Sequence, residues 1–329
     1  MAAPRGQWDS GRVGHGHEHG THVGAADRRW LLASLGVILV FMVAEVVAGL
    51  LANSLALIAD AGHMLTDAAA LGLAVIASRI AERPARGAFT YGFARVDALS
   101  GQANGITLLL LAVWFVVEGV RRLLDPAEVQ GGIVVVVAAI GAGVSVLATW
   151  LAGRADRSGL NVRGVLAHLL NDVWAFGATL VSGVVVLTTG WLRADAVATF
   201  VVAGLMAWTG TGLVRAANRV FLEAAPQGLD PADIGGALVA GDGVAEVHDL
   251  HVWNIGASDT ALSAHVLVDR EYDCHAVSAQ LRALLAERYG ISHVTLQVDH
   301  ADAQEHRAHR AEQCTDSHGV IHSAPGTLR

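Results

Sequence analysis

The sequence predicts an α-helical membrane protein that carries a small α+β domain after its last apolar segment. The 329 residues are 53% hydrophobic and 16% charged, with a mean hydropathy of +0.47. Soluble domains carry about 25% charged residues. Apolar segments long enough to cross a bilayer follow one another as far as residue 213, and alternating, strand-like patterns replace them after residue 223.

Six apolar segments, each near the ~20 residues that a spanning helix needs, predict six transmembrane helices. They cover residues 30–51, 57–80, 96–120, 132–152, 162–188 and 194–213. The third and fifth segments also contain polar residues, which inside a span usually face the interior of the helix bundle.

Arginine placement predicts the orientation of these helices. If the N-terminus is cytoplasmic, eleven arginines lie at the inner ends of the segments and three lie at the outer ends, which is the positive-inside pattern. The inner group is Arg28, Arg29, Arg79, Arg83, Arg86, Arg95, Arg154, Arg157, Arg163, Arg215 and Arg219, and the outer group is Arg121, Arg122 and Arg193. We therefore expect a multi-pass protein of the cell (inner) membrane with both termini in the cytoplasm.

Four regions follow from these patterns. Residues 1–27 form a His-rich cytoplasmic tail, 28–222 a six-helix transmembrane domain, 223–300 a cytoplasmic α+β domain, and 301–329 a disordered tail that also contains histidines. In the α+β domain we expect helices at 231–239 and 274–289 and strands at 244–255, 260–268 and 294–299, in the order αββαβ. The first tail contains His15, His17, His19 and His22, which either collect metal or belong to a dispensable end.

One pattern occurs twice inside the apolar segments, as His63-x-x-x-Asp67 and His168-x-x-x-Asp172. A charged group at the centre of a bilayer costs about 3 kcal/mol or more unless it is paired or liganded. The spacing places each His and its Asp on one helix face. Two such helices facing each other offer two imidazoles and two carboxylates, which suit a tetrahedral Zn²⁺.

The predicted orientation places both patterns at one depth. Asp67 lies about 12 residues from the outer end of its helix, and Asp172 about 11 residues from the inner end of its own. At ~1.5 Å per residue, both carboxylates fall near the middle of a ~30 Å hydrocarbon core. Asp60 lies one turn before His63 and is either an accessory metal contact or a hydrogen-bonding residue of the bundle. Glu45, Asn53 and Asn104 read as polar packing between helices.

The chain resembles the cation diffusion facilitator family, in its zinc-transporting (His-Asp/His-Asp) branch. The resemblance covers roughly residues 28–300 and is most specific over 49–67, with further matches at 91–95, 161–172 and 248–253. It implies six transmembrane helices, a cytoplasmic metallochaperone-like domain, a homodimer, and metal export in exchange for protons. It also implies that His63, Asp67, His168 and Asp172 form the transport site.

The resemblance further implies a regulatory metal site in the cytoplasmic domain, formed by His248, His265 and Asp299. The alternative is that these strand residues merely face solvent. Some relatives have a second metal site in the loop between the second and third helices. Residues 83–93 contain no His, Cys, Asp or Glu here, so we expect that site to be absent.

The function expected from these features is export of Zn²⁺ from the cytoplasm in exchange for protons. The ligand set suits Cd²⁺, Co²⁺ and Ni²⁺ as well. Loading such a site releases protons, because metal ligands must be deprotonated, and imidazole exchanges protons near neutral pH. We expect no organic cofactor. The net charge of −8 and the absence of a basic patch exclude nucleic acid as an expected partner.

Three other functions are alternatives to metal export. A membrane metalloenzyme is disfavoured, because there is no His-Glu-x-x-His pattern and four protein ligands leave no open position on zinc. We therefore expect that the protein is not an enzyme. A membrane-bound metal sensor or storage protein would not need charged ligands in the bilayer core. A passive metal channel is the third alternative, although a tight four-ligand site binds too strongly for fast conduction.

Overall fold

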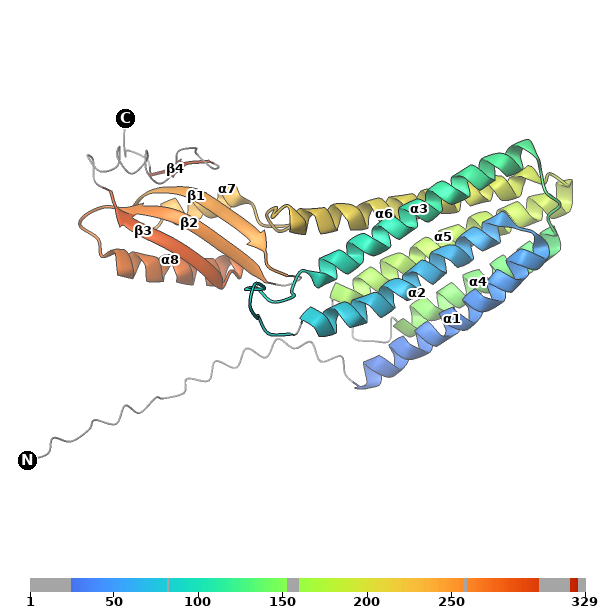
Figure 1. The fold of residues 1–329 in the computed structure, drawn as a ribbon, viewed down its shortest axis with the longest axis horizontal. Helices are drawn as coiled ribbons and strands as arrows, with labels where there is room; N and C mark the ends of the chain where they lie inside the picture. Colours follow the sequence, from blue (N-terminus) through green and yellow to red (C-terminus); the bar gives the residue numbers. More distant parts are fainter. Residues whose placement is uncertain (1–24, 82, 153–159, 257–258, 302–319, 325–329) are drawn as a thin grey trace, which may run out of the picture.

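The computed structural model describes residues 25–81, 83–152, 160–256, 259–301 and 320–324. Six long helices form a bundle, and a small sheet domain lies at one end of it (Figure 1). The helices are α1 (Ala25–Ala52), α2 (Leu55–Ala81), α3 (Val96–Leu124), α4 (Gly131–Ala152), α5 (Leu160–Thr189) and α6 (Arg193–Phe221). Each contains one of the six predicted apolar segments almost in full, so the prediction of an α-helical bundle is confirmed.

The helices differ in the length of their apolar stretches. Within the described residues, three stretches are long and apolar enough to span a bilayer: Val96–Leu124, Asp172–Thr189 and Arg193–Phe221. Three further apolar stretches are shorter: Leu39–Ala52, Leu55–Thr66 and Gly131–Leu147. The prediction of six spans therefore stays a prediction. Large apolar side chains such as Leu110, Val113 and Trp208 are exposed on the bundle surface, as expected of groups that face lipid.

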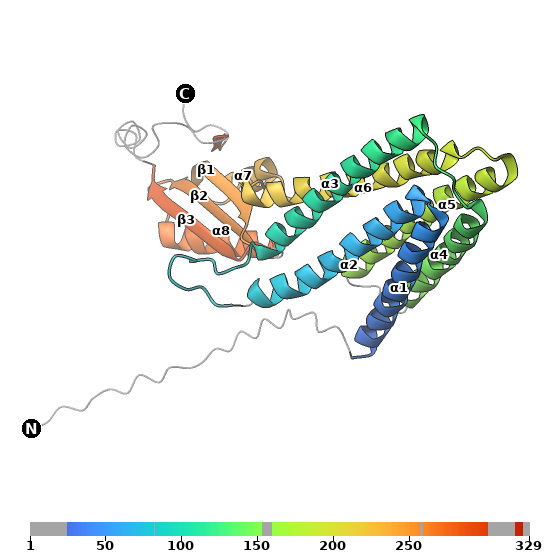
Figure 2. The ribbon, with the colours of Figure 1, turned by 45° about the vertical axis from the view of Figure 1, so that its right-hand side comes forward.

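Helices α3 and α6 form a closely packed pair and lie side by side in both views (Figures 1 and 2). A Cβ atom at Gly105 would lie 2.8 Å from the carbonyl oxygen of Gly210. Small residues of this kind let helix backbones approach closely. Toward the sheet domain, Arg95 Nη2 pairs with Glu223 Oε1 at 2.8 Å. The α3–α6 pair is thus fixed along its length.

The other four helices pack on one another and on this pair. Helix α4 lies against α5 and α1, while α2 contacts α1, α3 and α6. The main buried cluster joins four helices, α2, α3, α5 and α6. Its members are Leu55, Ala59, Leu108, Ala112, Phe115, Ala175, Val202, Ala203 and Met206. The helix that carries His63 is therefore packed against the α3–α6 pair.

The sheet domain has the predicted order αββαβ. Its elements are α7 (Pro231–Val239), β1 (Val244–Asn254), β2 (Thr260–Val268), α8 (Cys274–Tyr289) and β3 (His293–His300). Strand β1 is antiparallel to β2, and β2 is parallel to β3. Both helices pack on one face of the sheet, because Ile234 of α7 and Leu281 of α8 share one core with Val247 and Val266. The other face carries His248 and His265.

Local sequence explains where the two helices of this domain begin. The side chain of Asp230 accepts a hydrogen bond from Ala232 N at 2.9 Å, and Pro231 follows at the first helical position. Asp273 caps α8 in the same way, by accepting from His275 N at 2.9 Å. Gly290 ends α8 with φ of 68°. These are the residue types that N-caps and C-caps favour.

The prediction of a disordered tail at 301–329 is wrong at one point. Strand β4 (His322–Ser323) pairs with β1 in the antiparallel sense, and extends the sheet to the order β3-β2-β1-β4. Main-chain groups at the free edge of β1 accept this added strand. The imidazole of His322 occupies the space in which a Cβ at Gly235 would lie. Residues 302–319 and 325–329, and the predicted tail over 1–24, lie outside the described residues.

The loop before α3 contacts the sheet domain (Figure 1). The ring of Tyr91 meets that of His293 edge-on, with centroids 6.0 Å apart. A Cβ at Gly256 would lie 2.8 Å from Ala94 Cβ. The start of the α3–α6 pair therefore rests directly on the sheet domain.

Candidate metal site in the helix bundle

The two predicted His–Asp patterns lie on helices that contact each other, α2 and α5. Helix α2 is continuous through His63 and Asp67, and α5 through His168 and Asp172, so each pair shares a helix face as predicted. The imidazole of His63 is 1% exposed and the carboxyl of Asp172 is 7% exposed. The side chains of Asp67 and His168 lie outside the described part of the structure. Half of the predicted set is therefore seen to be buried in the bundle.

Asp60 is also buried, at 1% exposure, one turn before His63 on α2. Helix α3 approaches α2 closely beside these residues. A Cβ at Gly62 would lie 3.3 Å from the ring of Phe115. The near-complete burial of Asp60 and His63 removes both side chains from contact with lipid.

A further acidic residue, Glu45 of α1, belongs to the same region. It is wholly buried, and its carboxyl lies within electrostatic range of those of Asp60 and Asp172. The carboxyl of Glu45 on α1 is thus near one acidic residue of α2 and one of α5. Sequence reasoning treated Glu45 as polar packing. The feature of the sequence that indicates a functional role for Glu45 is its position inside an apolar run, where acidic residues rarely occur without a function.

These groups can bind cations or protons. Buried carboxylates that lie near one another repel, and they become stable only when protons or a cation neutralise them. Among the described residues, no three His, Cys, Asp or Glu side chains are gathered at distances that would hold a metal ion. Of the four predicted ligands, the described residues His63 and Asp172 are buried.

The sheet domain brings together two of its three predicted residues. His248 and His265 are register partners on β1 and β2, with ring centroids 5.4 Å apart. Asp299 lies on β3 opposite Leu267, two positions beyond the partner of His265, and accepts a hydrogen bond from Gln297 Nε2 at 3.0 Å. The three residues share one face of the sheet. Asp299 does not complete a three-ligand cluster with the two imidazoles in the described residues.

Glu246 is an unpredicted neighbour of this His pair. Its Oε1 lies 3.1 Å from His248 Nδ1, and its side chain is only 6% exposed. A carboxylate at Nδ1 fixes the ring and leaves Nε2 for another partner, as in many His metal ligands. The two-residue spacing of Glu246 and His248 on one strand was the signal, since such residues share a face.

An apolar bundle that buries carboxyl and imidazole groups, joined to a small α+β domain, defines a class of helical membrane proteins. The chain belongs to the cation efflux family within that class. The family's sequence pattern for the "cation efflux transmembrane domain" matches residues 31–222, and that for the "cation efflux protein, cytoplasmic domain" matches residues 226–301. The predicted resemblance is confirmed.

Characterised relatives cover nearly the whole chain. A cadmium, cobalt and zinc/H(+)-K(+) antiporter of Bacillus velezensis is 33% identical over 87% of this chain and 92% of its own. The zinc transporter ZitB of Escherichia coli K12 is 33% identical over 88% and 93%. The metal cation efflux system protein CzcD of Cupriavidus metallidurans is 33% identical over 89% and 94%.

A solved structure of a relative's domain resembles part of this chain. It is described as the metal-bound C-terminal domain of the CzcD transporter. It is 32% identical, covers 21% of this chain and 97% of its own, and has a TM-score of 0.21.

Proposed function

We propose that this protein exports Zn²⁺ from the cytoplasm in exchange for protons, and that His63, Asp67, His168 and Asp172 hold the ion in transit. The observation that carries the proposal is the burial of His63 and Asp172 on two contacting helices of a cation efflux bundle. Imidazole and carboxylate are ligands that Zn²⁺ accepts. The relatives named as zinc transporters and antiporters support the same cargo and the same coupling.

Charge explains how one site can exchange two kinds of ion. The region contains more buried acid than a neutral bundle tolerates, because the buried carboxyl of Glu45 lies within electrostatic range of Asp60 and of the predicted ligand Asp172. Zn²⁺ neutralises part of this charge when it is bound, and protons do so when it has left. Neither state leaves uncompensated carboxylates in the membrane. The burial of Asp60 one turn before His63 supports a role as an accessory contact on the ion path.

The remaining features are proposed on the same basis. The protein spans the cell membrane six times, with both termini in the cytoplasm, and works as a homodimer without an organic cofactor or an enzymatic activity. Cd²⁺, Co²⁺ and Ni²⁺ fit the same donor atoms. In the cytoplasmic domain, His248 and His265, with Asp299 on the next strand, form a regulatory metal site. The register pairing of the two imidazoles supports it.

Zinc flux into proteoliposomes under an imposed proton gradient tests the transport proposal. The parent chain should accumulate Zn²⁺, and Asp172→Ala should lower the initial rate by about 100-fold, since loss of a ligand exceeds the 10–100-fold cost of losing an orienting partner. The matched control is Asp125→Ala, which removes an exposed carboxylate and should leave the rate unchanged.

Two other results would contradict the proposal. Full flux in Asp172→Ala would remove this residue from the transport site. No flux in the parent, with Zn²⁺ still bound by the protein, would favour the membrane-bound sensor or storage function. Size-exclusion profiles of each variant separate these outcomes from misfolding.

A further inference from the structure

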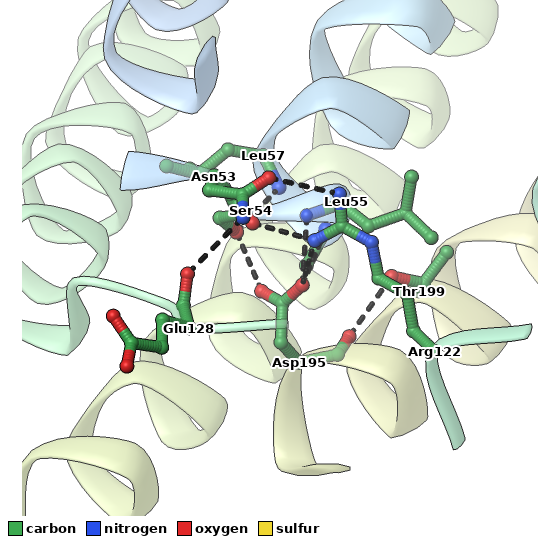
Figure 3. Close-up of polar contacts among 9 residues, drawn as sticks. Asn53, Ser54, Leu55, Leu57, Arg122, Glu128, Asp195 and Thr199 are labelled. Carbon is green, nitrogen blue, oxygen red and sulfur yellow. Dashed lines mark hydrogen bonds and ion pairs between the residues drawn. The ribbon is translucent and has the colours of Figure 1, made fainter. Parts of the chain in front are cut away.

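At the end of the bundle far from the sheet domain, which we call the distal end (Figure 1), one buried carboxylate links α6 to the start of α2 (Figure 3). Asp195 lies in the first turn of α6 and is 1% exposed. Its Oδ1 accepts a hydrogen bond from Ser54 Oγ at 2.5 Å, and its Oδ2 accepts from the backbone N–H of Leu55 at 2.7 Å. Ser54 and Leu55 are the residues at which α2 begins. A residue of α6 therefore caps another helix.

Two side chains, those of Asp195 and Ser54, accept hydrogen bonds from the first N–H groups of α2. The first N–H groups of a helix have no partner within it. Here the N–H groups of Leu55 and Ala56 donate to Asp195 Oδ2, the second at 3.4 Å, and that of Leu57 donates to Ser54 Oγ at 3.2 Å. A carboxylate at a helix N-terminus is also favoured by the helix dipole. The position of Asp195 thus decides where α2 starts.

Arg122 of α3 completes the arrangement. Its Nη1 lies 3.8 Å from Asp195 Oδ2 and donates to the backbone carbonyl of Asn53 at 2.5 Å, while its Nη2 donates to Asn53 Oδ1 at 3.2 Å. Asn53 adopts a left-handed conformation, with φ of 52°. Both anchors, Arg122 and Asp195, come from the α3–α6 pair. The α1–α2 turn is therefore held by that pair.

Helix α2 carries this constraint directly to the metal site. His63 lies eight residues after Leu55, which is ~12 Å along a helix, and a slip of one residue turns a helix by ~100°. No proline interrupts α2, so it transmits depth and rotation as a rigid element. A change at Asp195 would thereby displace His63 and Asp67 relative to Asp172.

We propose that Asp195 is a positioning residue for transport, which sets the depth and rotation of α2 and so the geometry of the His63–Asp67 half of the ion site. The inference rests on the proposed transport function. It does not place Asp195 in contact with the ion. It predicts that the affinity of the site depends on a carboxylate at the far end of the helix.

The test measures initial Zn²⁺ flux against Zn²⁺ concentration in the proteoliposome assay. Asp195→Asn removes the charge at nearly constant shape and should raise the half-saturating concentration by about tenfold, the lower end of the cost of losing an orienting partner. Ser54→Ala removes the hydrogen bond to Asp195 Oδ1 and the one from Leu57 N. It keeps the Asp195 carboxylate on the N–H groups of Leu55 and Ala56, and should raise the half-saturating concentration less. Asp125→Asn makes the same substitution at an exposed residue of the distal end and should match the parent.

The half-saturating concentration separates positioning from a merely structural role. Loss of folded protein lowers the maximal flux and leaves half-saturation unchanged. Parental half-saturation in Asp195→Asn would overturn the proposal, whatever its maximal flux. If Asp195→Asn does not fold, Ser54→Ala decides by the same criterion. An inactive parent would instead overturn the transport function on which the inference rests.

Discussion

Glu45 lies wholly buried on α1, within electrostatic range of two further acidic residues, Asp60 and Asp172. An isolated carboxylate in an apolar medium is strongly disfavoured, so its place beside Asp60 and Asp172 requires protons or a cation. The proposed exchange of Zn²⁺ for protons supplies one of these in each state. Glu45 therefore contributes charge to the site even though the family resemblance did not name it.

Replacing Glu45 by glutamine tests this role. Glu45→Gln keeps the shape but carries no charge and accepts no proton, so Zn²⁺ flux should fall by about tenfold or more. Glu118→Gln is the control, because Glu118 forms a surface pair with Arg121, and such pairs contribute little. Both are measured in proteoliposomes under the same proton gradient. Parental flux in Glu45→Gln would show that its charge is not used.

At the scale of elements, the α3–α6 pair is the fixed frame of the bundle. The close approach at Gly105 and Gly210 joins the two helices in their middle, and Arg95 with Glu223 joins them near the sheet domain. At the distal end the same pair carries the two residues that hold α2. The α3–α6 pair is therefore the frame on which α2 is held.

Two glycines on α3 provide a matched test of that packing. A Cβ at Gly105 would meet Gly210 O and Val214 Cγ2 at 2.8 and 2.9 Å, whereas a Cβ at Gly101 would have nothing within 4 Å. Gly105→Ala should lower the melting temperature in detergent by about 2–6 °C, because overpacking costs roughly 1–3 kcal/mol. Gly101→Ala should not lower it, since alanine favours helix. A melting temperature of Gly105→Ala equal to that of the parent would contradict the close contact between α3 and α6.

At the scale of the whole molecule, the two ends of the bundle are built differently. At the distal end, Asp195 and Arg122 hold the turn between α1 and α2. The other end rests on the sheet domain through the contacts of Tyr91 with His293 and of Ala94 with Gly256. A metal-dependent change at His248 and His265 would reach the bundle through this loop, at the start of the α3–α6 pair.

Cysteine labelling tests the proposed orientation. Cys274 is a free, partly exposed cysteine at the start of α8. In a Cys314→Ser background, a membrane-impermeant maleimide should label it in inside-out vesicles and not in intact cells. Asp125→Cys in an otherwise cysteine-free chain reports on the distal end and should show the opposite pattern. Labelling of Cys274 in intact cells would contradict the proposed cytoplasmic location of the sheet domain.

Local features of the sequence were enough to place most elements. Apolar length predicted six helices, and caps such as Asp230 and Asp273 lie where the soluble helices begin. Period-two alternation predicted β2. The tail strand was missed, because His322 and Ser323 pair with β1 across a long chain separation and carry no strand pattern of their own.

The candidate site was predictable only in part for a similar reason. The spacing of His63 with Asp67 and of His168 with Asp172 defines a helix face within one element. The approach of Glu45 to Asp172, and the contact of Glu246 with His248, depend on how elements turn and pack. Ser54 and Asp195 are 141 residues apart in the chain, and no local pattern links them.

The sequence by itself determined that this chain forms apolar helices, an αββαβ domain and two His–Asp patterns within those helices, because periodicity, capping and charge act over a few residues. Only the tertiary structure decided which helices meet, that a third carboxyl joins Asp60 and Asp172, and that Asp195 of α6 caps α2. Those contacts are fixed by close helix packing between segments far apart in the chain, and packing is a property of the assembled fold.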